Sequence, residues 1–139
     1  MLDGVPRSLP ALLRAQRIQE KAARTGFDWK DATGAWTKVK EEVHELDEAL
    51  AGGASAKLQE ELGDLLFAVV NVARLLGLDA EGCLQRSADK FRRRFMLMES
   101  EIAAEGKRLS ETSLEQMDRF WEAAKAREKD PGDPENRRP

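Results

Sequence analysis

The sequence of 139 residues contains no tyrosine, one histidine and one cysteine. The single cysteine, Cys83, excludes an internal disulfide framework, and we expect it to be a small core residue. The longest uninterrupted apolar run, residues 65–70, is far shorter than the ~20 residues that a membrane-spanning helix requires, and the N-terminus has no apolar signal core. We therefore expect a soluble, cytoplasmic protein that does not insert into a membrane.

The chain also lacks an excess of positive charge. Its 23 lysines and arginines are outnumbered by 26 aspartates and glutamates, which gives a formal net charge of -3. A protein without a broad basic field does not attract nucleic acid or an anionic membrane surface as a whole. Nucleic acid is therefore not expected as a partner, and any phosphate binding must be local.

β-branched residues are sparse, whereas Ala, Leu, Glu, Lys and Arg dominate, a composition typical of helices. No segment alternates convincingly with a period of two, and apolar residues recur at steps of three and four. We expect a first helix that ends near Gly26 and a second helix that continues from Val39 to Gly52. A third helix is expected from a cap at Ser55 to Gly77, and a fourth from a cap at Asp79 to Gly106. A last helix is expected to begin at a Ser113–Gln116 capping box. We predict an all-α fold with a four-helix-bundle core and one additional helix.

We expect a single domain over residues 1–129, followed by a Pro-rich, charged and disordered tail over residues 130–139. Within that domain the third helix, residues 55–77, is apolar around nearly its whole circumference. One small bundle covers only part of such a helix. The functional unit is therefore expected to be a homodimer or a higher homo-oligomer.

Acidic residues interrupt this apolar helix. At roughly 100° per residue, Glu61, Asp64 and Asn71 fall on one stripe of it. On the preceding helix Glu42 lies about 60° from the centre of the apolar face formed by Val39, Val43, Leu46 and Leu50, and Glu45 lies at its edge. Four neighbouring carboxylates are costly to bury because each must be desolvated and like charges repel. Few basic residues share these stripes, so divalent cations would neutralise them, and an all-oxygen site selects Mg²⁺ or Mn²⁺ over zinc.

A simpler interpretation stays open for part of this pattern. Acidic pairs spaced i, i+3 are common in a chain with 35% charged residues, so Glu42 and Glu45 also fit a solvated helix edge. Asn71 also fits a core amide whose hydrogen bonds are satisfied. Glu61 and Asp64 are harder to explain in this way, because their helix is otherwise apolar.

The combined pattern KVKEEVHELDEAL and LQEELGDLLFAVVNVARLLG resembles the MazG nucleoside triphosphate pyrophosphohydrolases of the all-α pyrophosphatase superfamily. Their signature, E-E-x-x-E followed by E-x-x-D on the next helix, falls on Glu41, Glu42, Glu45, Glu61 and Asp64.

The resemblance extends from about Leu9 through Lys125 and is closest to the second, catalytically competent domain of two-domain MazG proteins. The segment DGVPRSLPAL resembles their interdomain linker. The sequence lacks a first domain, which leaves open a naturally short protein or an excised domain.

The resemblance implies Mg²⁺-dependent hydrolysis of a nucleoside triphosphate to the monophosphate and pyrophosphate. Glu42, Glu45, Glu61 and Asp64 would be the catalytic metal ligands, and a water activated by metal or carboxylate would attack the α-phosphorus. Metal ions suit this chemistry because they neutralise the triphosphate and lower the pKa of water.

The resemblance also implies substrate-binding residues. Lys90 and Arg94, one helical turn apart, resemble the family's phosphate-binding pair, and Lys57 is a weaker candidate. Trp121 matches the family position for a flat apolar surface against the base, and Asn71 resembles a position that reaches the sugar or base. The basic run around Lys90 also fits an ordinary solvated face. Trp29 and Trp36, which flank the loop before the second helix, also fit core anchors.

Three functions remain open at this stage. The first is a broad-specificity housecleaning enzyme of the nucleotide pool. The second is a narrow dUTP, dCTP or phosphoribosyl-ATP pyrophosphohydrolase, because these enzymes share the acidic core and no motif here reports the substrate. The third is a non-catalytic helical module that binds nucleotides or a partner chain, against which the intact set of four expected ligands argues.

Overall fold

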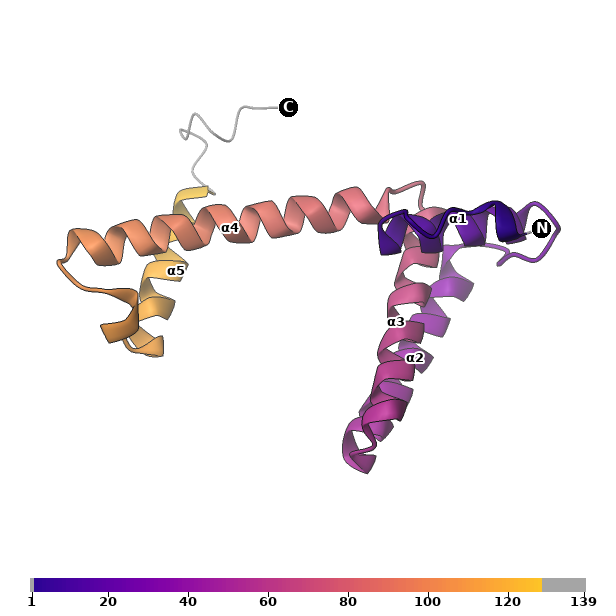
Figure 1. The fold of residues 1–139 in the computed structure, drawn as a ribbon, viewed down its shortest axis with the longest axis horizontal. Helices are drawn as coiled ribbons and strands as arrows, with labels where there is room; N and C mark the ends of the chain where they lie inside the picture. Colours follow the sequence, from indigo (N-terminus) through magenta and orange to yellow (C-terminus); the bar gives the residue numbers. More distant parts are fainter. Residues whose placement is uncertain (1, 129–139) are drawn as a thin grey trace. The chain divides into compact units, whose positions relative to one another are not determined.

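The computed structural model describes residues 2–128, and all regular structure in this range is helical, without a strand. The all-α prediction is therefore confirmed, whereas the tail predicted over residues 130–139 lies outside the described residues. Two short 3-10 helices accompany five α-helices (Figure 1). The elements are η1 (Leu2–Gly4), α1 (Ala11–Ala23), α2 (Ala32–Gly52), α3 (Ser55–Leu75), α4 (Ala80–Ala104), η2 (Leu109–Glu111) and α5 (Leu114–Glu128).

The chain forms two compact units, one ending at Leu84 and the other beginning at Gln85. The first contains α1, α2, α3 and the first residues of α4. The second contains the rest of α4 together with η2 and α5. Over residues 2–128, no helix is long and apolar enough to cross a membrane.

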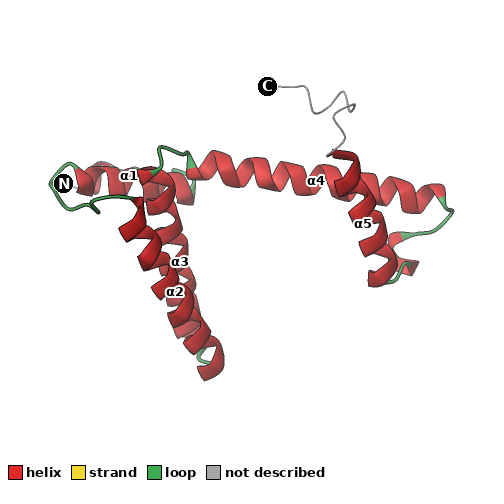
Figure 2. Ribbon diagram, turned by 180° about the vertical axis from the view of Figure 1, so that it is seen from behind, coloured by secondary structure: helices red, strands yellow, loops and turns green. Residues whose placement is uncertain are grey.

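In the first unit α2 and α3 form a helical hairpin, side by side in both views (Figures 1 and 2), and α1 packs on α3. The buried stripe of α2 contains Ala35, Val39, Glu42 and Ala49 at steps of four, three and seven residues. On α3 the buried residues are Glu61, Ala68 and Val70. Small residues on both helices allow the backbones to approach closely, so this contact is the core of the unit.

The burial of α2 corrects one expectation from the sequence. The apolar face was expected to be centred on Val39, Val43, Leu46 and Leu50, with Glu42 to one side. Instead Glu42 lies within the buried stripe, whereas Val43 and Leu50 are exposed. The position of α3 against α2 decides which residues are covered, and it selects the face that carries Glu42.

The C-terminal ends of the helices agree with the sequence to within a few residues, whereas α2 begins at Ala32, before the expected Val39. Gly53 ends α2 with a φ of 69° and donates its N–H to the Ala49 carbonyl, a geometry that glycine adopts without strain. Gly26, with a φ of 87°, lies in the turn two residues after Arg24, the C-cap of α1, so this helix ends slightly before the glycine near which it was expected to end. Ser55 was also wrong as an N-cap, because Ala54 takes that position and α3 begins one residue earlier than expected.

Two side-chain caps define other helix starts. The Asp31 side chain accepts hydrogen bonds from the N–H groups of Thr33 (2.9 Å) and Gly34 (3.2 Å) at the start of α2. The predicted capping box before α5 is confirmed. The Ser113 N–H donates to Gln116 Oε1, and the Gln116 N–H donates to Ser113 Oγ, both at 3.3 Å.

In the second unit α5 contacts α4 through the Arg94–Glu128 and Arg127–Glu101 ion pairs. Met98, Ile102 and Ala124 are buried there. The apolar face of α4 continues to Phe91 and Phe95, but both of these rings remain exposed. In this unit the buried residues of α4 are therefore confined to its end, although α5 also reaches Phe91, whose ring centroid lies 5.1 Å from that of Trp121.

Candidate functional site

Three carboxylates converge where α2 packs on α3. Glu42, Glu45 and Glu61 each contribute one oxygen, and these oxygens all lie within 4.8 Å of one another. Glu42 is 5% exposed and Glu61 is 2% exposed, whereas Glu45 lies at the exposed edge. The structure thus brings together three of the four carboxylates that the sequence singled out as metal ligands.

A lysine one turn earlier on the same helix neutralises each buried carboxylate in part. Lys38 Nζ lies 2.7 Å from Glu42 Oε1, and Lys57 forms an ion pair with Glu61 Oε1. The second oxygen of each carboxylate, Glu42 Oε2 and Glu61 Oε2, is buried and has no hydrogen-bond partner among the described residues. A buried charged oxygen without a partner is costly, so a cation or a water molecule at these oxygens would stabilise the cluster.

The electrostatics of the cluster agree with such stabilisation by a cation. The negative charge of Glu42 raises the pKa of Glu45 above its usual value, because two neighbouring carboxylates resist ionising together. A hydrogen bond from Lys57 lowers the pKa of Glu61. Closely spaced oxygens, two of them orphaned, are the donor set of a hard divalent cation. The residues present therefore fit Mg²⁺ or Mn²⁺.

Asp64 lies beside this cluster, in the wall of a cleft. The cleft has a volume of about 500 Å³ and is lined by residues of α1, α2, α3 and the loop between α1 and α2. Glu42 and Asp64 both line it, as does Asn71, which the sequence associated with the sugar or base. Asp64 is exposed and lies outside the group of three converging carboxylates. One cleft therefore joins acidic residues to a residue expected to bind the nucleoside.

Several cleft residues were missed by the sequence analysis, namely Lys38, Phe67, Arg74 and Asp28. A signal was available for Arg74, because it is the only basic residue between positions 58 and 76 of an apolar helix. Asp28 had no such signal, because its partner is 46 residues away in the sequence.

The interpretation of Trp29 and Trp36 as core anchors was wrong, since both side chains are exposed, at 43% and 50%. Trp29 lines the cleft, where an exposed aromatic face is open to a ligand.

The remaining predicted substrate residues belong to the second unit. Lys90 is exposed on α4, and Arg94 Nε donates to Glu128 Oε2 at 2.6 Å. The Trp121 ring packs against Phe91, with ring centroids 5.1 Å apart. In this unit Arg94 is held by α5, and Trp121 has one face against an aromatic neighbour.

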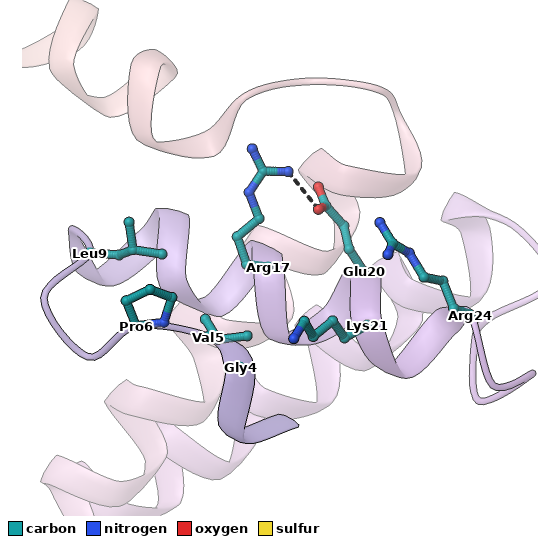
Figure 3. A pocket seen from close by; sticks show the side chains of 8 residues that line it. All are labelled: Gly4, Val5, Pro6, Leu9, Arg17, Glu20, Lys21 and Arg24. Carbon is teal, nitrogen blue, oxygen red and sulfur yellow. Dashed lines mark hydrogen bonds and ion pairs between the residues drawn. The ribbon is translucent and has the colours of Figure 1, made fainter. Parts of the chain in front are cut away.

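Figure 3 shows a second pocket, of about 250 Å³, beside α1. At roughly 100° per residue, the residues of α1 that line it fall on the opposite face of the helix from Gln19 and Ala22, which line the cleft. Arg17, Lys21 and Arg24 line it, and Arg17 forms an ion pair with Glu20 at 2.7 Å. The N-terminal segment that resembles a linker packs here, and its Val5 is buried. None of the predicted site residues lines this pocket.

Comparison with known proteins agrees with the geometry. The profile of the MazG nucleotide pyrophosphohydrolase domain matches residues 18–96, more than half of the chain and the whole of α2 and α3. A nucleoside triphosphate pyrophosphohydrolase of Escherichia coli (strain K12) is 47% identical over 131 residues, which cover 93% of this chain and 50% of that protein.

Two further relatives come from other bacteria. A Thermotoga maritima protein named nucleoside triphosphate pyrophosphohydrolase/pyrophosphatase MazG is 46% identical over 117 residues, covering 84% of this chain and 45% of that protein. The uncharacterized protein YabN of Bacillus subtilis is 45% identical over 130 residues, covering 93% of this chain and 27% of that protein. The chain therefore spans about half the length of the Escherichia coli relative and slightly less than half of the Thermotoga maritima relative. The match over its central helices shows that this chain belongs to the MazG nucleotide pyrophosphohydrolase family.

Proposed function

We propose that this chain hydrolyses nucleoside triphosphates to nucleoside monophosphates and pyrophosphate in the presence of Mg²⁺, with Mn²⁺ as a substitute. The observation that carries the proposal is the pair of buried carboxylates, Glu42 and Glu61, each of which has one oxygen without a partner among the described residues. Glu42 also lines a cleft of about 500 Å³. The names of the Escherichia coli and Thermotoga maritima relatives support the same activity.

The acidic residues would hold the metal. Glu42, Glu45 and Glu61 converge, and Asp64 extends the acidic surface into the cleft. The chemistry that Mg²⁺ supplies when bound is neutralisation of triphosphate charge and a lower pKa for a water molecule. The protein holds the carboxylates ready for this role, because Glu42 and Glu61 are fixed in the helix contact rather than on mobile surface rotamers.

The cleft would take the nucleoside. Trp29 and Phe67 offer apolar faces for the base, and Asn71 offers its amide nitrogen to the sugar or base, since its Oδ1 already accepts from Arg74. Lys38 and Lys57 are the cations nearest the carboxylates and could pair with phosphate oxygens once metal replaces them there. Trp29 is thus a second candidate for base stacking, in addition to Trp121.

Lys90 and Arg94 on α4 are proposed as the phosphate-binding pair. Their spacing of four residues places both cations on one face of the helix, one turn apart. Support for this assignment comes from the sequence pattern that also carries the family match.

We propose that two copies of the chain complete the helical bundle. Exposed apolar residues form one stripe along α3, namely Leu62, Leu66, Val69 and Leu76. Their steps of four, three and seven residues place them on a single face. Val43 and Leu50 add exposed apolar surface on α2. A contiguous apolar surface of this kind is typical of an interface, and a second copy of the chain would bury it in a four-helix core.

The test is a pyrophosphate-release assay over canonical and damaged nucleoside triphosphates, with Mg²⁺ or with EDTA. We expect Mg²⁺-dependent release that Glu61→Gln abolishes. Glu60→Gln is the matched control, because it makes the same change at the neighbouring, exposed position. Turnover of a single nucleotide would favour a narrow-specificity enzyme. Saturable nucleotide binding without release of pyrophosphate would instead favour a non-catalytic module.

A further inference from the structure

The loop between α1 and α2 carries Phe27, Asp28 and Trp29 to the cleft. Gly26, with its positive φ of 87°, turns the chain at one end of this loop, and Asp31 caps α2 at the other. Neither of these local features determines the position of the loop relative to α3, on the other side of the cleft. A contact with α3 is needed for that.

Arg74 provides this contact. Its side chain is only 12% exposed. Nη1 donates to Asp28 Oδ2 at 3.0 Å, and Nη2 donates to Asp28 Oδ1, so the carboxylate is held by two parallel hydrogen bonds. Nε also donates to Asn71 Oδ1 at 2.9 Å. A bidentate arginine–carboxylate pair, here with a largely buried guanidinium, fixes direction as well as distance, which a lysine could not do.

Asp28 transmits this restraint to Trp29. Asp28 Oδ1 also accepts the Trp29 N–H at 2.8 Å. On the other side the indole lies against the first turn of α2, since a Cβ atom at Gly34 would come within 2.9 Å of Trp29 Cε3. The backbone of Trp29 is therefore tied to the Asp28 carboxylate, while its ring lies against the bare backbone at Gly34. The position of the ring in the cleft depends on both contacts.

We propose that Arg74 is a positioning residue for nucleoside recognition. Its clamp on Asp28 holds Trp29 as the wall against which the nucleoside of the substrate packs. This inference rests on the proposed function and assigns different parts of the substrate to different residues of the site. Four hydrogen bonds from the Arg74 guanidinium already go to Asp28 or Asn71, which favours a role in holding the loop over a role as a phosphate ligand. The clamp acts on the nucleoside, whereas the carboxylate cluster acts on the phosphates.

The test compares a substrate that has a nucleoside with a ligand that lacks one. The variants are Asp28→Asn, which keeps the shape of the side chain, and Arg74→Lys, which keeps the charge but loses the bidentate contact. Steady-state kinetics with a nucleoside triphosphate would give KM and kcat. Inorganic tripolyphosphate, used as a competitive inhibitor with Mg²⁺, would give an inhibition constant that reports phosphate binding alone. Asp47→Asn on the exposed face of α2 is the matched control.

We expect KM for the nucleoside triphosphate to rise roughly tenfold or more in both clamp variants. The reason is that losing contacts with Trp29 worth about 1.4 kcal/mol would lower the affinity for the nucleoside tenfold. The inhibition constant of tripolyphosphate should stay within about twofold of the wild-type value, and kcat should change far less than KM. An equal loss for both ligands would overturn the proposal, since Arg74 would then act on the phosphates. No loss for either ligand would overturn it as well.

Hydrogen exchange provides a readout that does not depend on activity. The amides of residues 27–29 should exchange faster in Asp28→Asn than in the wild-type protein or in Asp47→Asn, because the loop has lost its tie to α3. If the wild-type protein released no pyrophosphate from any triphosphate, the proposed function would fail while this measurement still tested the clamp. Unchanged exchange would show that Arg74 does not hold the loop.

Discussion

Lys57 and Glu61 form an ion pair across one turn of α3, in which the lysine is more than half exposed and the carboxylate is almost completely buried. Lys38 and Glu42 repeat this arrangement on α2. Each buried carboxylate therefore carries its own counter-ion, four residues earlier on the same helix. The two lysines supply positive charge where a bound divalent cation would supply it.

Replacing Lys57 should have opposite effects on the metal-free and metal-bound protein. In Lys57→Met, the melting temperature in EDTA should fall, because Glu61 loses its counter-ion. The affinity for Mg²⁺ should rise roughly tenfold, since the cation no longer competes with an ammonium group. Thermal unfolding and titration calorimetry measure the two effects, with Lys40→Met on the exposed side of α2 as the control. Weaker Mg²⁺ binding would mean that Lys57 supports the metal site instead of competing for it.

Asp64→Asn should reduce pyrophosphate release by roughly 100-fold or more, the usual loss when one preorganised group is removed from the reaction centre. The helical fold should persist because Asp64 is exposed, and the metal-free protein should become no less stable, since one charge leaves an acidic surface. Kinetics and circular dichroism check both points, with Asp47→Asn as a matched removal of charge. Near-normal activity would show that Asp64 is a solvated residue of the cleft wall without a role in catalysis.

Lys90→Ala should raise KM for a nucleoside triphosphate roughly tenfold without changing the stability of the fold, because the side chain is exposed. Arg94→Ala should also lower stability, since it leaves Glu128 without its 2.6 Å partner. Glu128→Gln separates the two effects by weakening that ion pair while keeping Arg94. Arg93→Ala, at the exposed neighbouring position, is the control. Unchanged KM and kcat in both alanine variants would assign the pair to the solvated surface.

Leu66→Glu should convert the assembled protein into monomers, because it places a charge in the exposed apolar stripe of α3. Sedimentation at micromolar concentration measures the change, and wild-type dimers should resist dilution, since obligate interfaces commonly exceed ~2,000 Å². Glu60→Gln, outside the stripe, should leave the assembly intact. A folded, active wild-type monomer would contradict the assembly proposed here.

The Asp28–Arg74 pair should make stability depend on pH in acid. A hydrogen bond from Arg74 lowers the pKa of Asp28 in the folded protein below its value in the unfolded chain, near 3.9. The stabilisation is therefore fully present above the unfolded pKa and is lost as the pH falls through the folded pKa. Urea unfolding from pH 6 to pH 3 should show the wild-type protein more stable than Asp28→Asn at pH 6, with the difference shrinking below about pH 4. A constant difference would mean that ionisation of Asp28 contributes nothing.

Local patterns in the sequence predicted much of what the structure contains. The Ser113–Gln116 capping box needs only four consecutive residues, so its hydrogen bonds follow from spacing. Gly53 ends α2 for a similarly local reason. The spacing of Glu42 from Glu45 likewise placed both carboxylates on one side of a helix, and the structure brings them together with Glu61.

The tertiary structure decided which of the possible faces is buried and which distant residues meet. Both Val43 and Glu42 are compatible with a buried position on α2, and only the packing of α3 covers Glu42 while leaving Val43 exposed. Asp28 and Arg74 meet across 46 residues because α1 packs on α3 and the following loop returns over the cleft. Spacing along a helix determines which side chains share a face, whereas burial and long-range ion pairs depend on how helices cross, and no short stretch of sequence encodes that crossing.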